Sequence, residues 1–371
     1  MRVCIYTKRL ARQIDEGFLR VAHEVIHEIA RHHEMLALFS HGDLPDEEGL
    51  ERIPANGSGL SLRLRARVRG FRPDVILYVP RSGASLHCFW IARLLRFYGR
   101  GAPVVVLTTQ PNDLAPLPRK LVSLLKPDLL LAASTREQQD LERKGCAAGF
   151  VPLGVDLEKF TPATPGRKME LRAKYGIGRE EFVALHIGHM NEGRNIRSLS
   201  QIQDNGNQVV IAASTFFAHD SSLIRDLEAH GVRFVTGYLD NVEEAYQSAD
   251  CYVFPTVSER ACIGQPLSVL EAMACNLPVV TTRFGGLPDL FPEEGGGLLY
   301  AGSMQDLAAK VSHVRDAFRR VAPRTREMVQ HYPWTRTGRE VLRFVEGLHS
   351  TDGKAKAVAG ADSRRKQCNE K

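Results

Sequence analysis

The sequence predicts an α/β protein that consists of two doubly wound, Rossmann-like domains. Short apolar runs alternate along the chain with longer segments in which apolar residues recur at three- and four-residue spacing. This alternation is typical of a parallel sheet that helices cover on both faces. It occurs twice within 371 residues, and a hydrophobic content of 43% is enough to build two cores.

The individual elements follow this scheme in order. The first half opens with a strand at 3–6 and an amphipathic helix at 18–30, and its further strands are expected at 35–39, 75–79, 104–108 and 129–132. In the second half, strands are expected at 183–187, 208–212, 232–236, 251–254 and 279–281. A last helix is expected from Tyr332 through Leu348.

The domain boundary is expected near 151–156, where proline and glycine precede a polar stretch at 163–168. We therefore divide the chain into an N-terminal domain at 1–160, a C-terminal domain at 161–330, a helix at 331–350 and a tail at 351–371. The tail contains six basic residues and almost no large apolar residues, so we predict that it is disordered.

The composition argues against several classes of protein. No run approaches the roughly 18 apolar residues that span a bilayer, and the first apolar segment is too short for a signal peptide. The seven cysteines form no Cys-x-x-Cys pair and no cluster at zinc spacing. We therefore expect a reducing, cytoplasmic location. No Asp-x-Asp pair is present, and we expect no metal.

The net charge of +6 is concentrated in two arginine clusters of the N-terminal half. The clusters consist of Arg63, Arg65, Arg67, Arg69 and Arg72, and of Arg93, Arg96 and Arg100. Two interpretations remain open: solvated helix faces, or a basic surface that rests peripherally on anionic lipid headgroups at the inner membrane face. Nucleic acid is not expected as a partner, because we see no aromatic residues interleaved with the arginines as a stacking platform.

The most informative stretch runs from residue 250 to residue 286. An apolar strand leads into a turn, the turn opens a helix at Pro266, and Glu271 lies on the second turn of that helix. The amides and the positive dipole of a helix start stabilise a diphosphate, and Glu271 can reach hydroxyl groups attached to it. A second strand ends in Gly285-Gly286, which lets the backbone approach a ligand closely.

At these residues the chain resembles the donor-binding core of the GT-B glycosyltransferases of family 4. The resemblance rests on 270–274, on 278–280 and on Gly285-Gly286 at the family distances, and extends to 151–156 and Phe160-Thr161-Pro162. A generic strand-helix-strand unit would explain the pattern but not these identities. The resemblance implies two Rossmann-like domains facing a central cleft, with the acceptor side at 1–160 and the nucleotide-sugar side at 161–330. It also implies that the last helix crosses back onto the N-terminal domain.

The resemblance further implies the roles of individual residues. Arg194 matches a cation that embraces the diphosphate, and Glu271 matches the carboxylate that receives the ribose hydroxyls. The expected donor-binding residues are Glu271, Gly188, Gly264, Leu267, Ser268 and Gly237, and the expected catalytic residues are Arg194, Gln110 and His189. The loop 15–17 and the segment 80–83 are expected on the acceptor side.

Three positions depart from the family pattern. His189 replaces an arginine, so one permanent charge becomes dependent on pH. Gln110 replaces a histidine that faces the transferred sugar, and Ile263 replaces a glutamate that contacts the donor sugar. Glu259 could reach the same space from the loop. Plain structural roles in turns and loops remain open for His189 and Gln110.

The function implied is a metal-independent, retaining glycosyltransferase that moves a hexose from a UDP- or GDP-sugar to a glycan or lipid-linked acceptor. No covalent cofactor is expected. The alternative is a non-catalytic GT-B protein that binds nucleotide or a partner without transferring sugar. A nucleotide-sugar epimerase shares this architecture but fits the Glu271 block less well.

Overall fold

The structure is a computed structural model that describes residues 1–14, 16–44, 49–54, 59–114, 119–190, 192–204, 207–213, 221–235, 239, 241–317 and 322–349. The chain divides into two units. The first consists of Met1–Leu153 and the C-terminal segment that begins at Trp334, and the second consists of Gly154–Pro333. The tail predicted at 351–371 lies outside the described residues.

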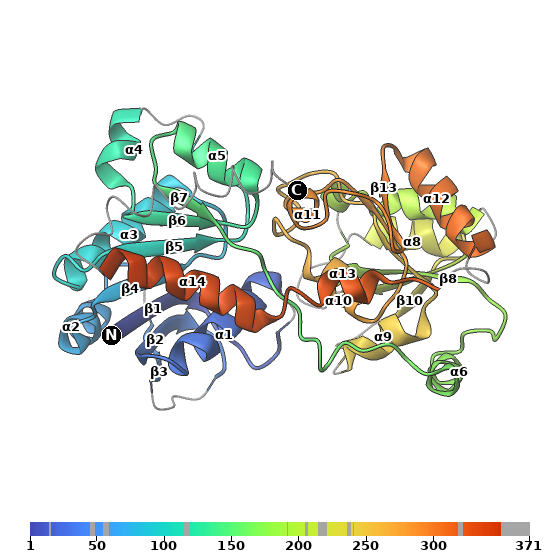
Figure 1. The fold of residues 1–371 in the computed structure, drawn as a ribbon, viewed down its shortest axis with the longest axis horizontal. Coiled ribbons are helices and arrows are strands. Elements are labelled where there is room, and N and C mark those ends of the chain that lie inside the picture. The colour runs from blue at the N-terminus through green and yellow to red at the C-terminus, as the bar shows by residue number, and fades with distance from the viewer. Residues whose placement is uncertain are drawn as a thin grey trace. The chain divides into compact units, whose positions relative to one another are not determined.

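The first unit contains a seven-stranded parallel sheet of order β3-β2-β1-β4-β5-β6-β7 (Figure 1). Its strands are β1 (Arg2–Arg9), β2 (Glu34–His41), β3 (Leu50–Arg52), β4 (Val75–Val79), β5 (Val104–Thr108), β6 (Leu129–Ala132) and β7 (Ala148–Phe150). The sequence did not predict β3 and β7, which are the two edge strands. Each has only three residues and no fully buried run, so neither leaves a clear apolar pattern.

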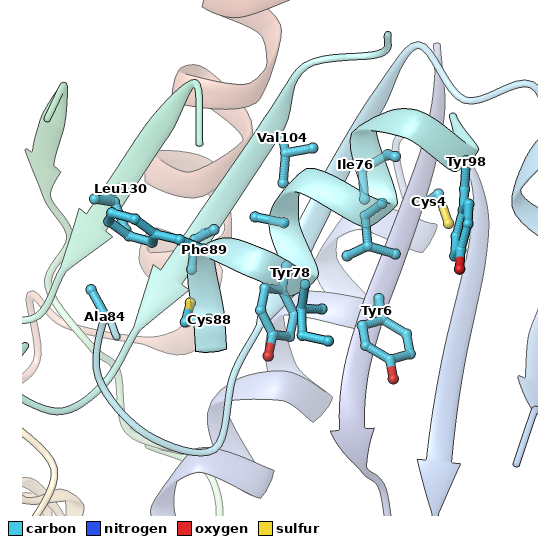
Figure 2. Packing of buried hydrophobic residues seen from close by; sticks show 14 of the residues in the cluster. Cys4, Tyr6, Ile76, Tyr78, Ala84, Cys88, Phe89, Tyr98, Val104 and Leu130 are labelled. Carbon is cyan, nitrogen blue, oxygen red and sulfur yellow. The ribbon is translucent and has the colours of Figure 1, made fainter. Parts of the chain in front are cut away.

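Helices pack on both faces of this sheet. They are α1 (Gly17–Ala30), α2 (Leu62–Phe71), α3 (Leu86–Tyr98), α4 (Arg119–Leu125), α5 (Thr135–Arg143) and α14 (Trp334–His349). Ser61, Ser85 and Ser134 are the N-caps of α2, α3 and α5, and each hydroxyl accepts the amide three residues later. Figure 2 shows Tyr6 and Tyr78 on the face that α3 covers, with ring centroids 5.7 Å apart.

The C-terminal helix α14 completes the first unit by packing against α1 and β4 (Figure 1). The Thr337 hydroxyl donates to the carbonyl of Pro152 at 2.9 Å. Gly338 lies directly against α1, because a Cβ built there would be 2.1 Å from Cγ of Glu28. Glycine is therefore the residue that allows this close helix contact.

The second unit contains a six-stranded parallel sheet of order β10-β9-β8-β11-β12-β13. Its strands are β8 (Val183–Gly188), β9 (Gln208–Ala213), β10 (Arg233–Val235), β11 (Cys251–Phe254), β12 (Val279–Thr282) and β13 (Leu298–Ala301). Its helices are α6 (Pro165–Lys174), η1 (Glu192–Arg194), η2 (Ile196–Ser198), α7 (Leu199–Asp204), α8 (Ser221–Ala229), α9 (Val242–Ser248), α10 (Leu267–Ala274), α11 (Leu287–Leu290), α12 (Met304–Ala317) and α13 (Thr325–Val329).

The strand order of the second unit reverses between β8 and β11. The chain adds β9 and β10 on one side of β8 and then returns to add β11, β12 and β13 on the other. Open α/β sheets bind ligands outside the carboxyl ends of the strands at such a switch point. The segments that follow β8 and β11 therefore form the candidate site.

Candidate functional site

The segment after β8 begins at Gly188 and leads to Arg194. The guanidinium of Arg194 is buried, and its Nε donates to the carbonyl of Ala261 at 3.1 Å while Nη2 lies 3.6 Å from Sγ of Cys262. A Cβ built on Gly188 would lie 2.4 Å from Nη1 of Arg194. The loop after β11 thus holds the guanidinium against the end of β8, where only glycine leaves room for it.

Asn195 fixes the direction of the chain immediately after Arg194. Its backbone adopts the left-handed conformation, with φ of 59°, which asparagine tolerates better than most residues. Its Nδ2 donates to the carbonyl of Pro255 at 3.4 Å. This contact is a second connection between the β8 and β11 segments, and the sequence analysis did not identify it.

Helix α10 places Glu271 on its second turn, as the sequence predicts. Pro266 is the N-cap and Leu267 the first helical residue, so the helix begins one residue later than expected. Ser268 forms a hydrogen bond with the buried hydroxyl of Tyr252 on β11. Leu267 and Ser268 both lie in the first turn, where helix amides face outward from the N-terminus.

Glu271 has a partner that the sequence analysis missed. The hydroxyl of Tyr246, a buried residue of α9, donates to Oε2 of Glu271 at 2.7 Å. Burial, followed by the charge of Glu271, raises the pKa of the Tyr246 hydroxyl well above its usual value. Tyr246 is therefore a protonated donor that orients the carboxylate of Glu271. No local motif marks it, because its contact crosses between two helices.

Gly264 and the diglycine segment contact each other directly. Gly285 has a φ of +51°, and a Cβ built there would lie 2.1 Å from the carbonyl oxygen of Gly264. The amide of Gly286 donates to the same oxygen at 2.7 Å. The close approach for which we expected the glycines is thus, in this structure, an approach to the chain's own backbone.

The altered positions occupy three different settings. His189 is half-buried directly after β8, and Ile263 is buried one residue beyond Cys262, which contacts Arg194. Gln110 belongs to the first unit and follows β5. Gly237 lies outside the part of the chain that the structure describes. The roles assigned to these residues stay predictions.

The described parts of the predicted acceptor-side segments meet within the first unit, whereas Asp15 lies outside the described residues. Glu16, the N-cap of α1, pairs with Arg81 after β4 at 3.7 Å and with Arg9 at the end of β1 at 3.4 Å. A Cβ built on Gly83 would lie 2.5 Å from the carbonyl oxygen of Gln110. The ends of β1, β4 and β5 thus bring these segments together.

Among the described residues, no group of three or more His, Cys, Asp or Glu side chains could hold a metal ion. Their cysteines are buried thiols without disulfides. None of the described helices is long and apolar enough to cross a membrane.

Comparison with known proteins identifies related sequences and folds. Residues 183–316 match the family model described as glycosyl transferases group 1. Sulfoquinovosyl transferase SQD2 of Arabidopsis thaliana is 28% identical over 343 residues, which cover 81% of this chain and 64% of that protein. A D-inositol 3-phosphate glycosyltransferase of Corynebacterium jeikeium is 30% identical over 47% of this chain and 46% of its own length.

An Escherichia coli protein named UDP-Gal:alpha-D-GlcNAc-diphosphoundecaprenol alpha-1,3-galactosyltransferase is 28% identical over 40% of each chain. The chain thus spans between two fifths and two thirds of the length of these curated relatives. Anabaena Alr3699/HepE, solved in complex with UDP, superposes with a TM-score of 0.72 and 15% identity over 93% of this chain and all of that one. Its GT-B fold is the fold of this protein. The chain is thus similar to the glycosyl transferases group 1 at residues 183–316, and its fold is the GT-B fold.

Proposed function

We propose that the protein is a metal-independent, retaining glycosyltransferase that uses a UDP- or GDP-hexose and a glycan or lipid-linked acceptor. The observation on which this rests is that two charged groups near the switch point of the second unit are each held in place by neighbouring residues. The loop after β11 holds Arg194 against Gly188, and Tyr246 orients Glu271 on α10. The names of the relatives, including one that uses UDP-galactose, support the same class of donor.

The chemistry we assign follows from these groups. Glu271 accepts the ribose hydroxyls, and the planar fork of Arg194 binds oxygens of the diphosphate. As the bond to the anomeric carbon breaks, negative charge grows on the diphosphate, and Arg194 stabilises it. The donor's own phosphate oxygen serves as the base for the acceptor hydroxyl, which requires no side-chain base. Gln110 hydrogen-bonds a sugar hydroxyl, and His189 adds a charge that depends on pH.

Calorimetric titration with UDP, GDP, ADP and their hexose conjugates, without divalent metal, tests the donor site. We expect one nucleotide to bind the native chain and Glu271→Ala to weaken it by at least tenfold, since two hydroxyl contacts are lost. Glu293→Ala, an exposed glutamate of the same unit, is the matched control. If the native chain binds none of these nucleotides, the proposal is wrong.

A non-catalytic nucleotide-binding protein is the second candidate. It is favoured by the apolar Ile263, which is buried where relatives are expected to place a carboxylate on the donor sugar. The two candidates differ in the fate of the bound donor. Incubation with the bound nucleotide sugar and a panel of glycan and polyprenyl-linked acceptors should yield a glycosylated product with retained anomeric configuration. An epimerase would change the sugar without any acceptor, and a scaffold would leave the donor intact.

We also propose that the first unit touches an anionic membrane through an exposed surface of α2 and α3. Its apolar members are unusually exposed: 83% for Leu62, 65% for Phe97 and 42% for Trp90. The α2/α3 surface consists of Leu62, Arg63, Arg65 and Arg69 from α2 and Leu86, Trp90, Arg93 and Phe97 from α3. On α3, the spacing of four, three and four residues places its members along one stripe.

Charge and geometry both fit a lipid surface. All four charged members of the α2/α3 surface are arginines, of which Arg63 pairs with Glu51 at 3.7 Å, so the surface complements anionic headgroups. The guanidinium of Arg65 lies over the ring of Phe97 at 5.3 Å from its centroid. Exposed Trp and Phe side chains beside basic ones are typical of a helix face that lies at the membrane–water interface. The inner membrane face, which is rich in anionic lipid, is therefore the location we propose.

Vesicle flotation tests this contact. We expect the protein to bind vesicles of phosphatidylglycerol but not of phosphatidylcholine, with binding that weakens as salt rises. Trp90→Ser combined with Phe97→Ser should reduce binding strongly, and Arg93→Gln by about fivefold, or about 1 kcal/mol. Leu124→Ser, which removes a similarly exposed side chain from α4, is the control.

The sequence interpretation excluded nucleic acid because it saw no aromatic residues among the arginines. Trp90 and Phe97 are in fact exposed beside Arg93 and Arg65. A single-stranded oligonucleotide is therefore included in the test. Binding of the oligonucleotide but not of vesicles would replace the membrane proposal.

A further inference from the structure

His186 is a buried polar side chain that has no assigned role in the proposed donor site. It lies on β8, two residues before Gly188, and its side chain is fully buried. Its Nδ1 is 2.9 Å from the carbonyl oxygen of Val253. A carbonyl only accepts, so Nδ1 bears the hydrogen in the neutral ring and Nε2 presents a lone pair.

This lone pair has no hydrogen-bond partner among the residues that the structure describes. Its direction is nevertheless fixed. The ring stacks on Tyr252 with centroids 6.3 Å apart and an interplanar angle of 18°, and it packs on Phe254 at 6.3 Å. A buried acceptor without a hydrogen-bond partner costs free energy. A phenyl ring would fill the same volume without this cost, so packing alone does not explain a histidine at this position.

The lone pair and the guanidinium of Arg194 flank the same point. A Cβ built on Gly188 would lie 3.2 Å from Nε2 of His186 and 2.4 Å from Nη1 of Arg194. Burial, and in addition the charge of Arg194, lower the pKa of His186 to about 4. The ring is therefore neutral near pH 7, and a neutral acceptor beside a guanidinium attracts its N–H groups, whereas an imidazolium would repel them.

We propose that His186 is a positioning residue for Arg194, accepting a guanidinium N–H at Nε2 when a nucleoside diphosphate is bound. The inference rests on the proposed donor site, since the diphosphate is the group that Arg194 contacts. The carbonyl of Ala261 and the thiol of Cys262 already approach the fork from one side. His186 supplies a further acceptor on the Gly188 side of the guanidinium, so that the fork is held in the orientation in which it meets phosphate oxygens.

The test compares two substitutions at this position. His186→Phe keeps a flat ring between Tyr252 and Phe254 but removes the acceptor, whereas His186→Gln keeps an acceptor. Calorimetry is done with the nucleoside diphosphate that the native chain binds and with the nucleoside of the same base. We expect His186→Phe to weaken binding of the diphosphate about tenfold and to leave binding of the nucleoside unchanged. In His186→Gln, much of the lost diphosphate affinity should be restored.

A double-mutant cycle separates positioning from packing. If His186 acts through Arg194, the His186→Phe change should have little further effect in an Arg194→Ala background. In the ¹⁵N-labelled native chain, the Nε2 resonance of His186 should shift on diphosphate addition as the lone pair becomes hydrogen-bonded, and it should not shift in Arg194→Ala.

The outcomes distinguish the two proposals. If the native chain binds no nucleotide, both the proposed donor site and the role of His186 are wrong. A native chain that binds a diphosphate just as well after His186→Phe contradicts the inference alone. If His186→Phe weakens the diphosphate and the nucleoside equally, or weakens the diphosphate equally with and without Arg194, then His186 only fills space. Circular dichroism checks that both His186 variants are folded.

Discussion

Tyr246 shows how one residue outside any motif can determine the orientation of a motif residue. The position of Glu271 on α10 follows from the sequence, because helix periodicity and Pro266 fix it to within a residue. The direction of its carboxylate does not, since it depends on a hydroxyl of α9. The same holds for Arg194, whose partners Ala261 and Cys262 lie more than 60 residues further along the chain.

Tyr246→Phe removes only this hydroxyl. We expect it to weaken nucleotide binding by about tenfold and to lower the free energy of unfolding by about 1 kcal/mol. Tyr175→Phe is a matched control, because the hydroxyl of Tyr175 donates at 2.8 Å to Glu244 in the same unit. Calorimetry and urea unfolding measure both effects. Equal affinity losses in the two variants would exclude a specific role for Tyr246.

Gly188→Ala tests the space reserved for Arg194. The added methyl group would occupy a point 2.4 Å from Nη1 of Arg194, so the guanidinium must move while the backbone stays. We expect the fold to persist and diphosphate affinity to fall by tenfold or more. Gly166→Ala, at a helical position with no atom within 4 Å of the new Cβ, should bind normally. Unaltered affinity in Gly188→Ala would place the diphosphate elsewhere.

His186 also makes stability depend on pH. The unfolded histidine titrates near pH 6.5, but burial lowers the folded pKa to about 4. Between these values the unfolded chain binds the extra proton, so the free energy of unfolding falls as the pH drops, by about 3 kcal/mol in all. Urea unfolding between pH 7 and pH 4 should show a shallower dependence in His186→Phe. Parallel curves for the two proteins would contradict the lowered pKa.

At the level of elements, several fully buried strands were predicted with their bounds, whereas the edge strands β3, β7 and β13 were missed. The strands at 75–79, 104–108, 129–132 and 251–254 have the predicted bounds, because every residue in them is buried and apolar patterning is unambiguous. The short edge strands β3 and β7 were missed, as was β13, which follows three glycines. For such segments, tertiary pairing rather than local pattern determines the structure.

Gly285→Ala tests the contact between the segments before α10 and after β12. The substitution strains a backbone with φ of +51° and places a methyl group 2.1 Å from the Gly264 carbonyl oxygen. We expect the free energy of unfolding to fall by about 2–3 kcal/mol. Gly302→Ala, where the nearest atom would be 3.9 Å away, should change it by less than about 1 kcal/mol. Urea denaturation measures both variants. Equal midpoints for Gly285→Ala and the native chain would show that the backbone around Gly285 and Gly264 adjusts to the added methyl group.

At the level of the whole molecule, the first unit depends on a helix that is distant in sequence. Gly338→Ala should destabilise this unit by about 1–3 kcal/mol, because its Cβ would meet the Glu28 side chain and push α14 from α1. Gly347→Ala lies on the same helix with open space around it, and should be neutral or stabilising by up to about 1 kcal/mol. Differential scanning calorimetry of both variants measures this, and identical transitions would mean that α14 contributes little.

The return of the chain to the first unit also sets the order in which a ribosome can complete the protein. Residues 154–333 emerge as one continuous stretch, so the second unit can fold during synthesis. The first unit begins earlier but is finished later, because α14 follows residues 154–333 in the chain. Until then, the faces of α1 and β4 that α14 covers are open to water and to chaperones.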